Sequence, residues 1–261
     1  MIYLKQFTGT ANVGDTIGSA IVASLLDCEV QIIGQAPVSK PNLIAIGSVA
    51  QWCDEHSVLW GCGFVSGDVL SAPPHRVLAL RGKHTRDMLR RAGVRCPETL
   101  GDPGLLSPGI FAASATKRFD IGVVPHYVDL QSPFVERCRR EGIVVIDPMS
   151  PIHAYIADLT ACRRIISSSL HGIVFAHAYG IPAAWITISD RVLGNGFKFR
   201  DYFSSLSIGS SDATTLRADD ETIATMAGAC FEPGRHGLPD RDELRAALVA
   251  YGPMLDDRAL A

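Results

Sequence analysis

The chain has 261 residues, of which 47% are hydrophobic and 20% are charged, and its formal net charge is −3. This composition excludes a chain that is disordered throughout, and the lack of a basic excess argues against a nucleic-acid partner. The seven cysteines form no CxxC pair, so we expect neither a disulfide framework nor a zinc site.

The first part of the chain alternates short apolar runs with amphipathic segments. A strand is predicted over residues 2–7, followed by a polar turn and a helix over residues 16–27. A second helix, over residues 84–92, is closed by Gly93, because glycine is common just after a helix end. Four more apolar runs have the length of strands: residues 30–34, 43–47, 58–60 and 77–80.

A second alternating series begins near residue 119, after a stretch at 107–117 whose Pro, Gly, Ser and Thr residues are typical of a linker. Its predicted strands are residues 121–124, 143–146, 164–167 and 183–188, and its predicted helices are residues 133–141, 152–161 and 172–179. A last helix starts with the capping-box pattern of Asp240 and Glu243 and runs through Tyr251.

Strands that alternate with helices predict parallel sheets with covered faces. We therefore expect an α/β fold of two Rossmann-like domains with a central cleft. The first domain takes residues 1–112, and the second takes residues 113–261 with the C-terminal helices.

Residues 165–189 contain no Lys, Arg, Asp or Glu and are long enough to cross a bilayer. Their Ser, His, Gly and Pro residues favour a buried strand, helix and strand in succession. The N-terminus lacks a signal-peptide pattern, so we expect a cytoplasmic protein.

Two of the candidate sites follow strands of the first domain, since ligands of open parallel sheets lie at the carboxyl ends of the strands. The turn with Asn12, Gly14 and Asp15 precedes a helix, whose N-terminus favours an anion, although Asp15 can equally cap that helix. Arg81 directly follows the predicted strand 77–80, and Thr85 lies near the start of the next helix. Its guanidinium can hold a carboxylate or phosphate, or form a salt bridge between the domains.

The strongest candidate is the segment 167–172, which joins a buried strand to a buried helix. Ser168, Ser169 and His171 need polar partners in so apolar a setting, and a ligand is one such partner. An imidazole there can accept and return a proton, whereas the alternative is a hydrogen-bonded core histidine. Two weaker signals are His126 after its strand and Asp102 in the segment 101–104, whose composition is that of a turn.

Residues 195–203 alternate basic and aromatic side chains. An extended segment would put Lys198 and Arg200 on one side and the aromatic rings on the other, and a solvated face is the alternative. Arg81 and Lys198 as charges, with His171 as acid and base, suit a transferase that uses a phosphorylated donor.

Taken in order, these motifs resemble the polysaccharide pyruvyltransferase family, in the branch that makes pyruvate ketals on xanthan-type and succinoglycan-type exopolysaccharides. The pieces that carry the resemblance are residues 12–15, 46–49, 60–63, Arg81-Gly82 with Thr85, residues 101–104, 167–172 and 178–182. The resemblance implies a GT-B-like fold. It also implies transfer from phosphoenolpyruvate to a lipid-linked oligosaccharide, with no cofactor and no metal, at the inner face of the inner membrane.

The resemblance also implies roles for the candidate residues. His171 and Asp15 are expected to be catalytic, and His126 and Arg200 to bind the acceptor. The expected donor-binding residues are Asn12, Gly14, Arg81, Thr85, Ser168, Ser169 and Lys198. Many members have an arginine where this chain has Ser169, so Lys198 or Arg200 is expected to supply that cation.

The main alternative is a GT-B-like glycosyltransferase that uses a nucleotide sugar. It needs a carboxylate for the ribose, and no residue is assigned to that role. A cleft-containing binding protein without activity is a further alternative, against which the presence of His171 argues.

Overall fold

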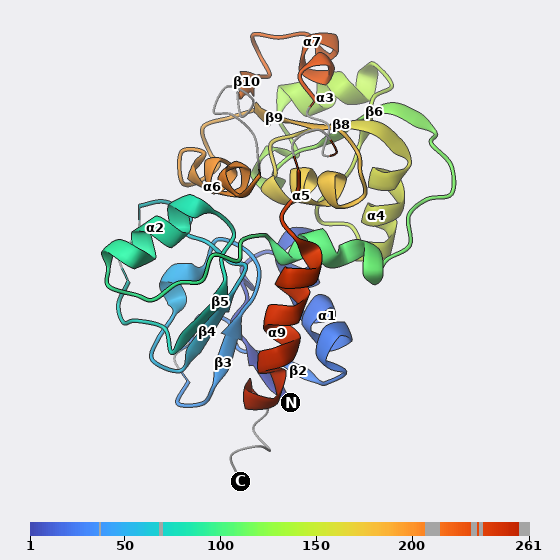
Figure 1. Cartoon of the computed structure of the whole chain (residues 1–261). Coiled ribbons are helices and arrows are strands. Elements are labelled where there is room, and N and C mark those ends of the chain that lie inside the picture. The colour runs from blue at the N-terminus through green and yellow to red at the C-terminus, as the bar shows by residue number, and fades with distance from the viewer. Residues whose placement is uncertain (37, 68–69, 207–214, 231–233, 235–236, 256–261) are drawn as a thin grey trace.

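Two parallel five-stranded sheets form the framework of the protein (Figure 1). The computed structural model describes residues 1–36, 38–67, 70–206, 215–230, 234 and 237–255. The first sheet contains β1 (Ile2–Leu4), β2 (Val30–Ile32), β3 (Asn42–Ile44), β4 (Ser57–Trp60) and β5 (Arg76–Ala79). The second contains β6 (Phe119–Val124), β7 (Val144–Val145), β8 (Cys162–Ser167), β9 (Ala183–Thr187) and β10 (Leu216–Arg217).

Both sheets have the same strand order. The first strand of each set lies between the second and the third, because β1 pairs with β2 and β3, and β6 pairs with β7 and β8. The chain therefore leaves β1 and β3, or β6 and β8, toward opposite faces of the sheet. Such a switch point opens a crevice at the carboxyl ends of the strands.

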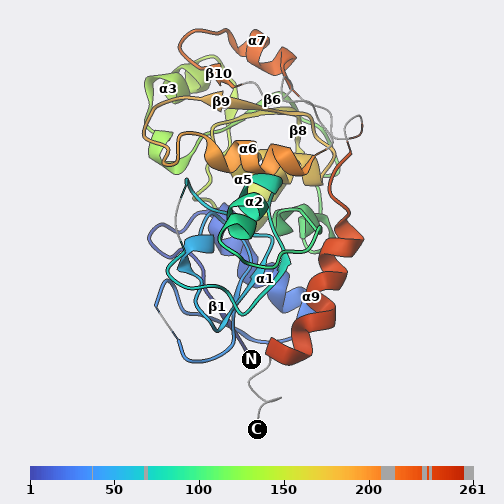
Figure 2. The ribbon, with the colours of Figure 1, turned by 60° about the vertical axis from the view of Figure 1, so that its left-hand side comes forward.

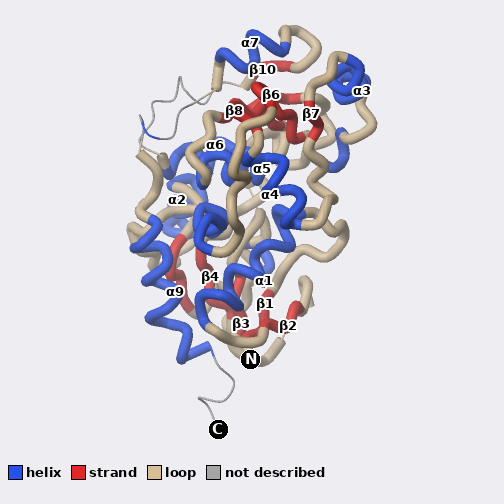
Figure 3. Tube along the Cα trace, turned by 90° about the vertical axis from the view of Figure 1, so that its right-hand side faces the viewer, coloured by secondary structure: helices blue, strands red, loops and turns tan. Residues whose placement is uncertain are grey.

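Helices lie between the two sheets and on the far side of the second sheet (Figure 3). The α-helices are α1 (Val13–Leu26), α2 (Lys83–Arg91), α3 (Pro133–Arg140), α4 (Ile152–Thr160), α5 (Leu170–Ala178), α6 (Phe197–Ser205), α7 (Ile223–Gly228) and α9 (Arg241–Leu255). Three 3-10 turns are η1 (Ala50–Trp52), η2 (Pro103–Gly109) and η3 (Tyr127–Asp129). All nine residues of α5 are buried, since this helix packs against β8 and β9 on one side and against η2 and α1 on the other.

Two helices join the halves of the molecule (Figure 2). Helix α9 follows the second sheet in sequence but packs against α1, β5 and η2, and the Trp60 indole donates a hydrogen bond to the Leu244 carbonyl at 2.8 Å. Helix α6 lies beside α2, where a Cβ on Gly82 would stand 1.7 Å from the Asp201 carbonyl oxygen. The domain boundary after residue 112 falls between the two sheets and stays a prediction.

The predicted alternation of strands and helices is confirmed, and with it the α/β fold. Residues 165–189 form the end of β8, then α5 and β9, as expected. No helix within the described residues is long and apolar enough to cross a bilayer. The first residues of the linker expected at 107–117 belong instead to η2, which packs against α5.

The extended segment expected at 195–203 is wrong, because residues 197–205 form α6. Phe199 and Phe203 are four residues apart, which is the spacing of one helix face. Both rings lie against Trp185, with ring centroids 4.6 Å and 6.4 Å away. Packing on Trp185 therefore selects the helix, although the alternation of basic and aromatic residues also fits a strand.

Candidate active site

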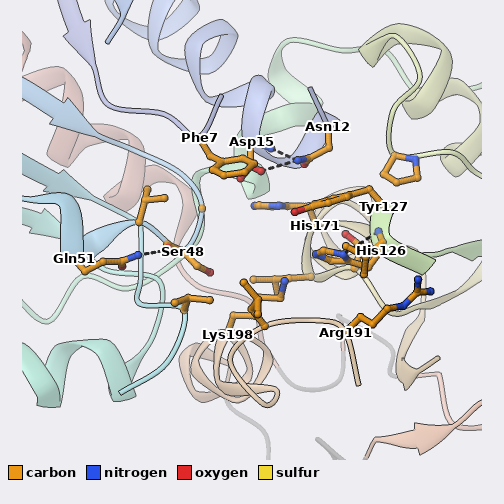
Figure 4. A pocket seen from close by; sticks show the side chains of 18 of the residues that line it. Phe7, Asn12, Asp15, Ser48, Gln51, His126, Tyr127, His171, Arg191 and Lys198 are labelled. Atoms are coloured by element: carbon orange, nitrogen blue, oxygen red, sulfur yellow. Dashed lines mark hydrogen bonds between the residues drawn. The ribbon is translucent and has the colours of Figure 1, made fainter. Parts of the chain in front are cut away.

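The loops that leave the two switch points line one pocket of about 460 Å³ (Figure 4). The first half contributes Phe7, Asn12, Asp15, Gly47, Ser48, Val49, Gln51, Trp52 and Val65. The second half contributes His126, Tyr127, Val128, Pro148, Ser169, Leu170, His171, Arg191, Leu193 and Lys198. The pocket therefore lies where the topology of both sheets favours ligand binding.

The structure brings together only part of the set of residues predicted from the sequence. Those that line the pocket are Asn12, Asp15, His126, Ser169, His171 and Lys198. Those that do not are Gly14, Arg81, Thr85, Ser168 and Arg200. Arg200 is exposed, and its guanidinium donates to the Asn195 carbonyl at 2.8 Å.

The N-terminus of α1 holds a carboxylate at the pocket wall. Asn12 is the N-cap, and its side-chain oxygen accepts from the Asp15 backbone N–H at 3.2 Å. Its amide nitrogen donates to Asp15 Oδ2 at 2.7 Å. Gly47, at a φ of 93°, leaves room for Asp15 Oδ1, which would lie 3.1 Å from a Cβ there. Asn12 rather than Asp15 thus caps the helix, and the Asp15 carboxylate is fixed beside the cavity.

His171, in the first turn of α5, is held from three sides. Its ring stacks on Phe175 with centroids 5.7 Å apart. Its Nε2 lies 3.6 Å from Oδ2 of Asp102, which is fully buried. Its Nδ1, on the other edge of the ring, lies beside Gly14, where a Cβ would stand only 2.1 Å away. Because Nε2 has no hydrogen-bond partner among the described residues, His171 does not have the environment of a satisfied core histidine.

Lys198 and Arg191 are cations that the second half of the chain contributes to the pocket lining. Lys198 is half-buried with its ammonium 5.6 Å from the Phe199 ring centroid. Desolvation lowers the pKa of Lys198 to about 8, an effect that nearby Arg81 reinforces and Asp15 opposes. Arg191 is more than half exposed at the rim, 3.3 Å from the buried Asp129 carboxylate. Both side chains are therefore available to an anion at neutral pH.

His126 is a neutral polar group of the pocket. Burial lowers the pKa of His126 to about 3, with smaller contributions from Lys198 and His171. Its Nδ1 accepts a long hydrogen bond of 3.5 Å from the Val128 N–H, so Nε2 carries the proton and acts as a donor. Ser168 supports this loop from behind, because its hydroxyl accepts from the His126 backbone N–H at 2.8 Å.

Arg81 forms the salt bridge that its sequence position left open as the alternative. Its fully buried guanidinium donates to Asp201 Oδ2 at 2.9 Å, Ser48 Oγ at 2.7 Å and the Phe64 carbonyl at 2.7 Å. Thr85 also binds Asp201, since its N–H and hydroxyl donate to the Asp201 carboxylate at 2.8 Å and 2.7 Å. Arg81 therefore contacts the pocket lining through Ser48 and does not itself line the pocket.

Several pocket residues were not singled out from the sequence. Phe7 follows β1 and Arg191 follows β9, so both stand at strand ends, where the signal was available. Asp102 lies in a segment whose composition predicts only a turn. Its contact with His171 joins residues far apart in the sequence, and no local pattern reveals it. Among the described residues, no group of three or more His, Cys, Asp or Glu is placed to hold a metal ion.

The sequence is similar to those of known proteins over most of this framework. Residues 58–190, just over half of the chain, match the family described as polysaccharide pyruvyl transferase. An uncharacterized protein of Acanthamoeba polyphaga mimivirus is 28% identical over 216 residues, which is 79% of this chain and 75% of that protein. The succinoglycan biosynthesis protein ExoV of Rhizobium meliloti (strain 1021) is 24% identical over 190 residues, or 69% and 55% of the two chains. The chain belongs to the polysaccharide pyruvyl transferase family.

Proposed function

We propose that this protein transfers the enolpyruvyl group of phosphoenolpyruvate to a sugar of a lipid-linked exopolysaccharide repeat unit, forming a pyruvate ketal and releasing phosphate. Family membership supports pyruvyl transfer, and the name of the Rhizobium relative supports exopolysaccharide synthesis. The observation that carries the proposal is the shared pocket, in which His171 and the cation Lys198 face one cavity. The domain pair 1–112 and 113–261, with a GT-B-like arrangement, belongs to the same proposal.

The donor carries a carboxylate and a phosphate, so its site needs at least two positive groups. Lys198 and Arg191 take these roles, helped by the N-terminus of α5 at Ser169. Ser169 has no side-chain capping bond and lines the pocket, so its hydroxyl is available to the donor. Arg81 supports this site indirectly, through Ser48 and through Asp201 on α6.

The reaction needs proton transfer at one carbon and two oxygens. His171 gives a proton to the methylene carbon of the donor, which creates an oxocarbenium-like centre at the neighbouring carbon. A sugar hydroxyl attacks that centre and returns its proton to His171. Phosphate then leaves with the proton of a second hydroxyl, which closes the ketal. Asp15 and the neutral His126 orient the two hydroxyls, since one accepts and the other donates a hydrogen bond.

The direct test combines the purified protein with phosphoenolpyruvate and lipid-linked oligosaccharides. We expect phosphate release that depends on the acceptor, and a product that gains one pyruvate ketal by mass spectrometry and NMR. Nucleotide sugars offered with the same acceptors test the glycosyltransferase alternative. Sugar transfer from a nucleotide, without consumption of phosphoenolpyruvate, would replace the proposal by that alternative.

The charge of Lys198 gives the donor affinity a pH dependence. With a pKa of about 8, Lys198 is a cation below that pH and becomes neutral above it. The KM for phosphoenolpyruvate is therefore expected to rise as the pH is raised from 7 to about 9. Lys198→Arg keeps its charge, so its KM is expected to stay flat over this range, whereas Lys198→Met should have a high KM throughout. A wild-type KM in Lys198→Met would remove Lys198 from the donor site.

The contact between Gly14 and His171 predicts a steric defect. In Gly14→Ala the new methyl group would stand 2.1 Å from His171 Nδ1 and 2.6 Å from its Cγ, so the ring must move. A displacement of this kind is expected to lower kcat by about 10²-fold. Gly228→Ala, where a Cβ meets nothing within 4 Å, is the matched control and should be neutral. Unchanged kcat in a folded Gly14→Ala protein would contradict the assigned position of the ring.

A further inference from the structure

Two buried polar atoms face each other behind the pocket. Asp102 is the N-cap of η2, and its Oδ1 accepts from the Gly104 backbone N–H at 2.8 Å. Its Oδ2 lies 3.6 Å from His171 Nε2, and in the part of the chain that the structure describes neither atom has a hydrogen-bond partner. Buried polar atoms without partners are costly, so this juxtaposition needs a reason.

The backbone fixes the Asp102 carboxyl group in place. The Gly101 N–H donates to the Leu80 carbonyl at 2.9 Å, which ties the segment to the end of β5. Gly104 lies against α5, where a Cβ would stand 2.9 Å from Val174 Cγ1. The fully buried carboxyl group of Asp102, from the first half of the chain, therefore lies against His171 in the second half. Since Asp102 does not line the pocket, it has no direct contact with a substrate there.

We propose that Asp102 is a positioning residue whose Oδ2 accepts the Nε2 proton of His171 and so leaves Nδ1 as the nitrogen that exchanges protons in the pocket. This inference rests on the proposed function. A carboxylate only accepts hydrogen bonds, so it selects the ring form with a proton on Nε2. We expect the 3.6 Å between Nε2 and Oδ2 to shorten to hydrogen-bond length in the reacting complex, because catalytic hydrogen bonds tighten there.

The proton balance of the transfer follows from this arrangement. Nδ1 gives its proton to the methylene carbon and takes one back from the first attacking hydroxyl. The Nε2 proton stays between the ring and Asp102 throughout, so the carboxylate stabilises the doubly protonated ring that starts and ends the step.

Asp102→Asn tests the tautomer without relying on activity. Oδ1 must keep its bond from the Gly104 N–H, so the amide nitrogen takes the place of Oδ2 and presents an N–H to Nε2. The proton of the neutral ring is then expected to move to Nδ1. Nitrogen-15 NMR of labelled histidines shows which ring nitrogen carries the proton. The signals that disappear in His171→Gln are those of His171. An unchanged tautomer in Asp102→Asn would overturn the inference.

Kinetics provide the second readout. In Asp102→Asn we expect kcat to fall by about 10²- to 10⁴-fold with little change in the KM for phosphoenolpyruvate. In a His171→Gln background the same substitution should add little further loss, because Asp102 acts through that ring. Wild-type kcat in Asp102→Asn, or an equal loss in both backgrounds, would overturn the positioning role.

The matched control is Asp54→Asn. Asp54 is largely buried and pairs with Lys5 at 2.6 Å, but it does not line the pocket or contact His171. We expect this variant to lose stability while keeping kcat and the His171 tautomer. If the wild type released no phosphate from phosphoenolpyruvate with any acceptor, the proposed function would fail. The NMR comparison would still decide whether Asp102 sets the state of the ring.

Discussion

His171→Gln is expected to lower kcat by about 10²- to 10⁴-fold, the range that general acid–base catalysis contributes. Glutamine keeps polarity and approximate volume, but it does not transfer protons near neutral pH. The ring it replaces lines the pocket, with Asp102 behind it and Gly14 beside its Nδ1. The thermal midpoint is expected to change only slightly, because Nε2 makes no hydrogen bond to any residue that the structure describes.

Helix α5 carries the control for this experiment. His177 is fully buried, and its Nδ1 lies 3.0 Å from the Tyr202 hydroxyl. Burial lowers the pKa of His177 to about 3, so its ring is neutral near pH 7. We expect His177→Gln to reduce stability while the folded fraction keeps near-normal kcat. If His171→Gln behaved in that way instead, His171 would be a core residue and not the catalytic one.

The regular part of the fold was predictable because its signals are local. The apolar runs that became β1, β4, β6 and β8 are flanked by turn residues, so each strand is recognisable in a short window. The order of strands within a sheet then puts the residues after them at one edge. Asn12, His126 and His171 all follow predicted strands, and the structure brings them to one pocket.

The rest depended on partners that are distant in sequence. Arg81 follows a strand, as an anion-binding arginine does, yet its partner Asp201 lies on α6, where the local pattern of basic and aromatic residues also fits an extended segment. The composition of residues 101–104 is that of a turn and gives no sign that Asp102 faces His171. Tertiary packing decides such cases, because it fixes which of two locally acceptable conformations or partners is used.

Arg81→Ala is expected to lower the free energy of unfolding by about 3–5 kcal/mol, the usual cost of removing one partner of a buried ion pair. Asp201 would remain fully buried, and the two bonds from Thr85 are all that the described residues then offer to offset its charge. Typical domains have about 5–15 kcal/mol of stability in total, so the substitution takes a large share. Urea denaturation would measure this loss of stability, provided that the dependence of the free energy of unfolding on urea concentration is the same in both proteins.

A double variant separates this structural role from the donor-binding role that the sequence suggested for Arg81. Arg81→Met with Asp201→Asn removes both charges, while the asparagine oxygen still accepts from the Thr85 N–H at the position of Oδ1. Most of the lost stability is expected to return, because no buried charge is left without its partner. The KM for phosphoenolpyruvate is expected to return toward the wild-type value as α6, which carries Lys198, regains its place beside α2. A stable double variant whose donor KM remains far above the wild-type value would instead assign Arg81 to the donor itself, acting on the pocket through Ser48.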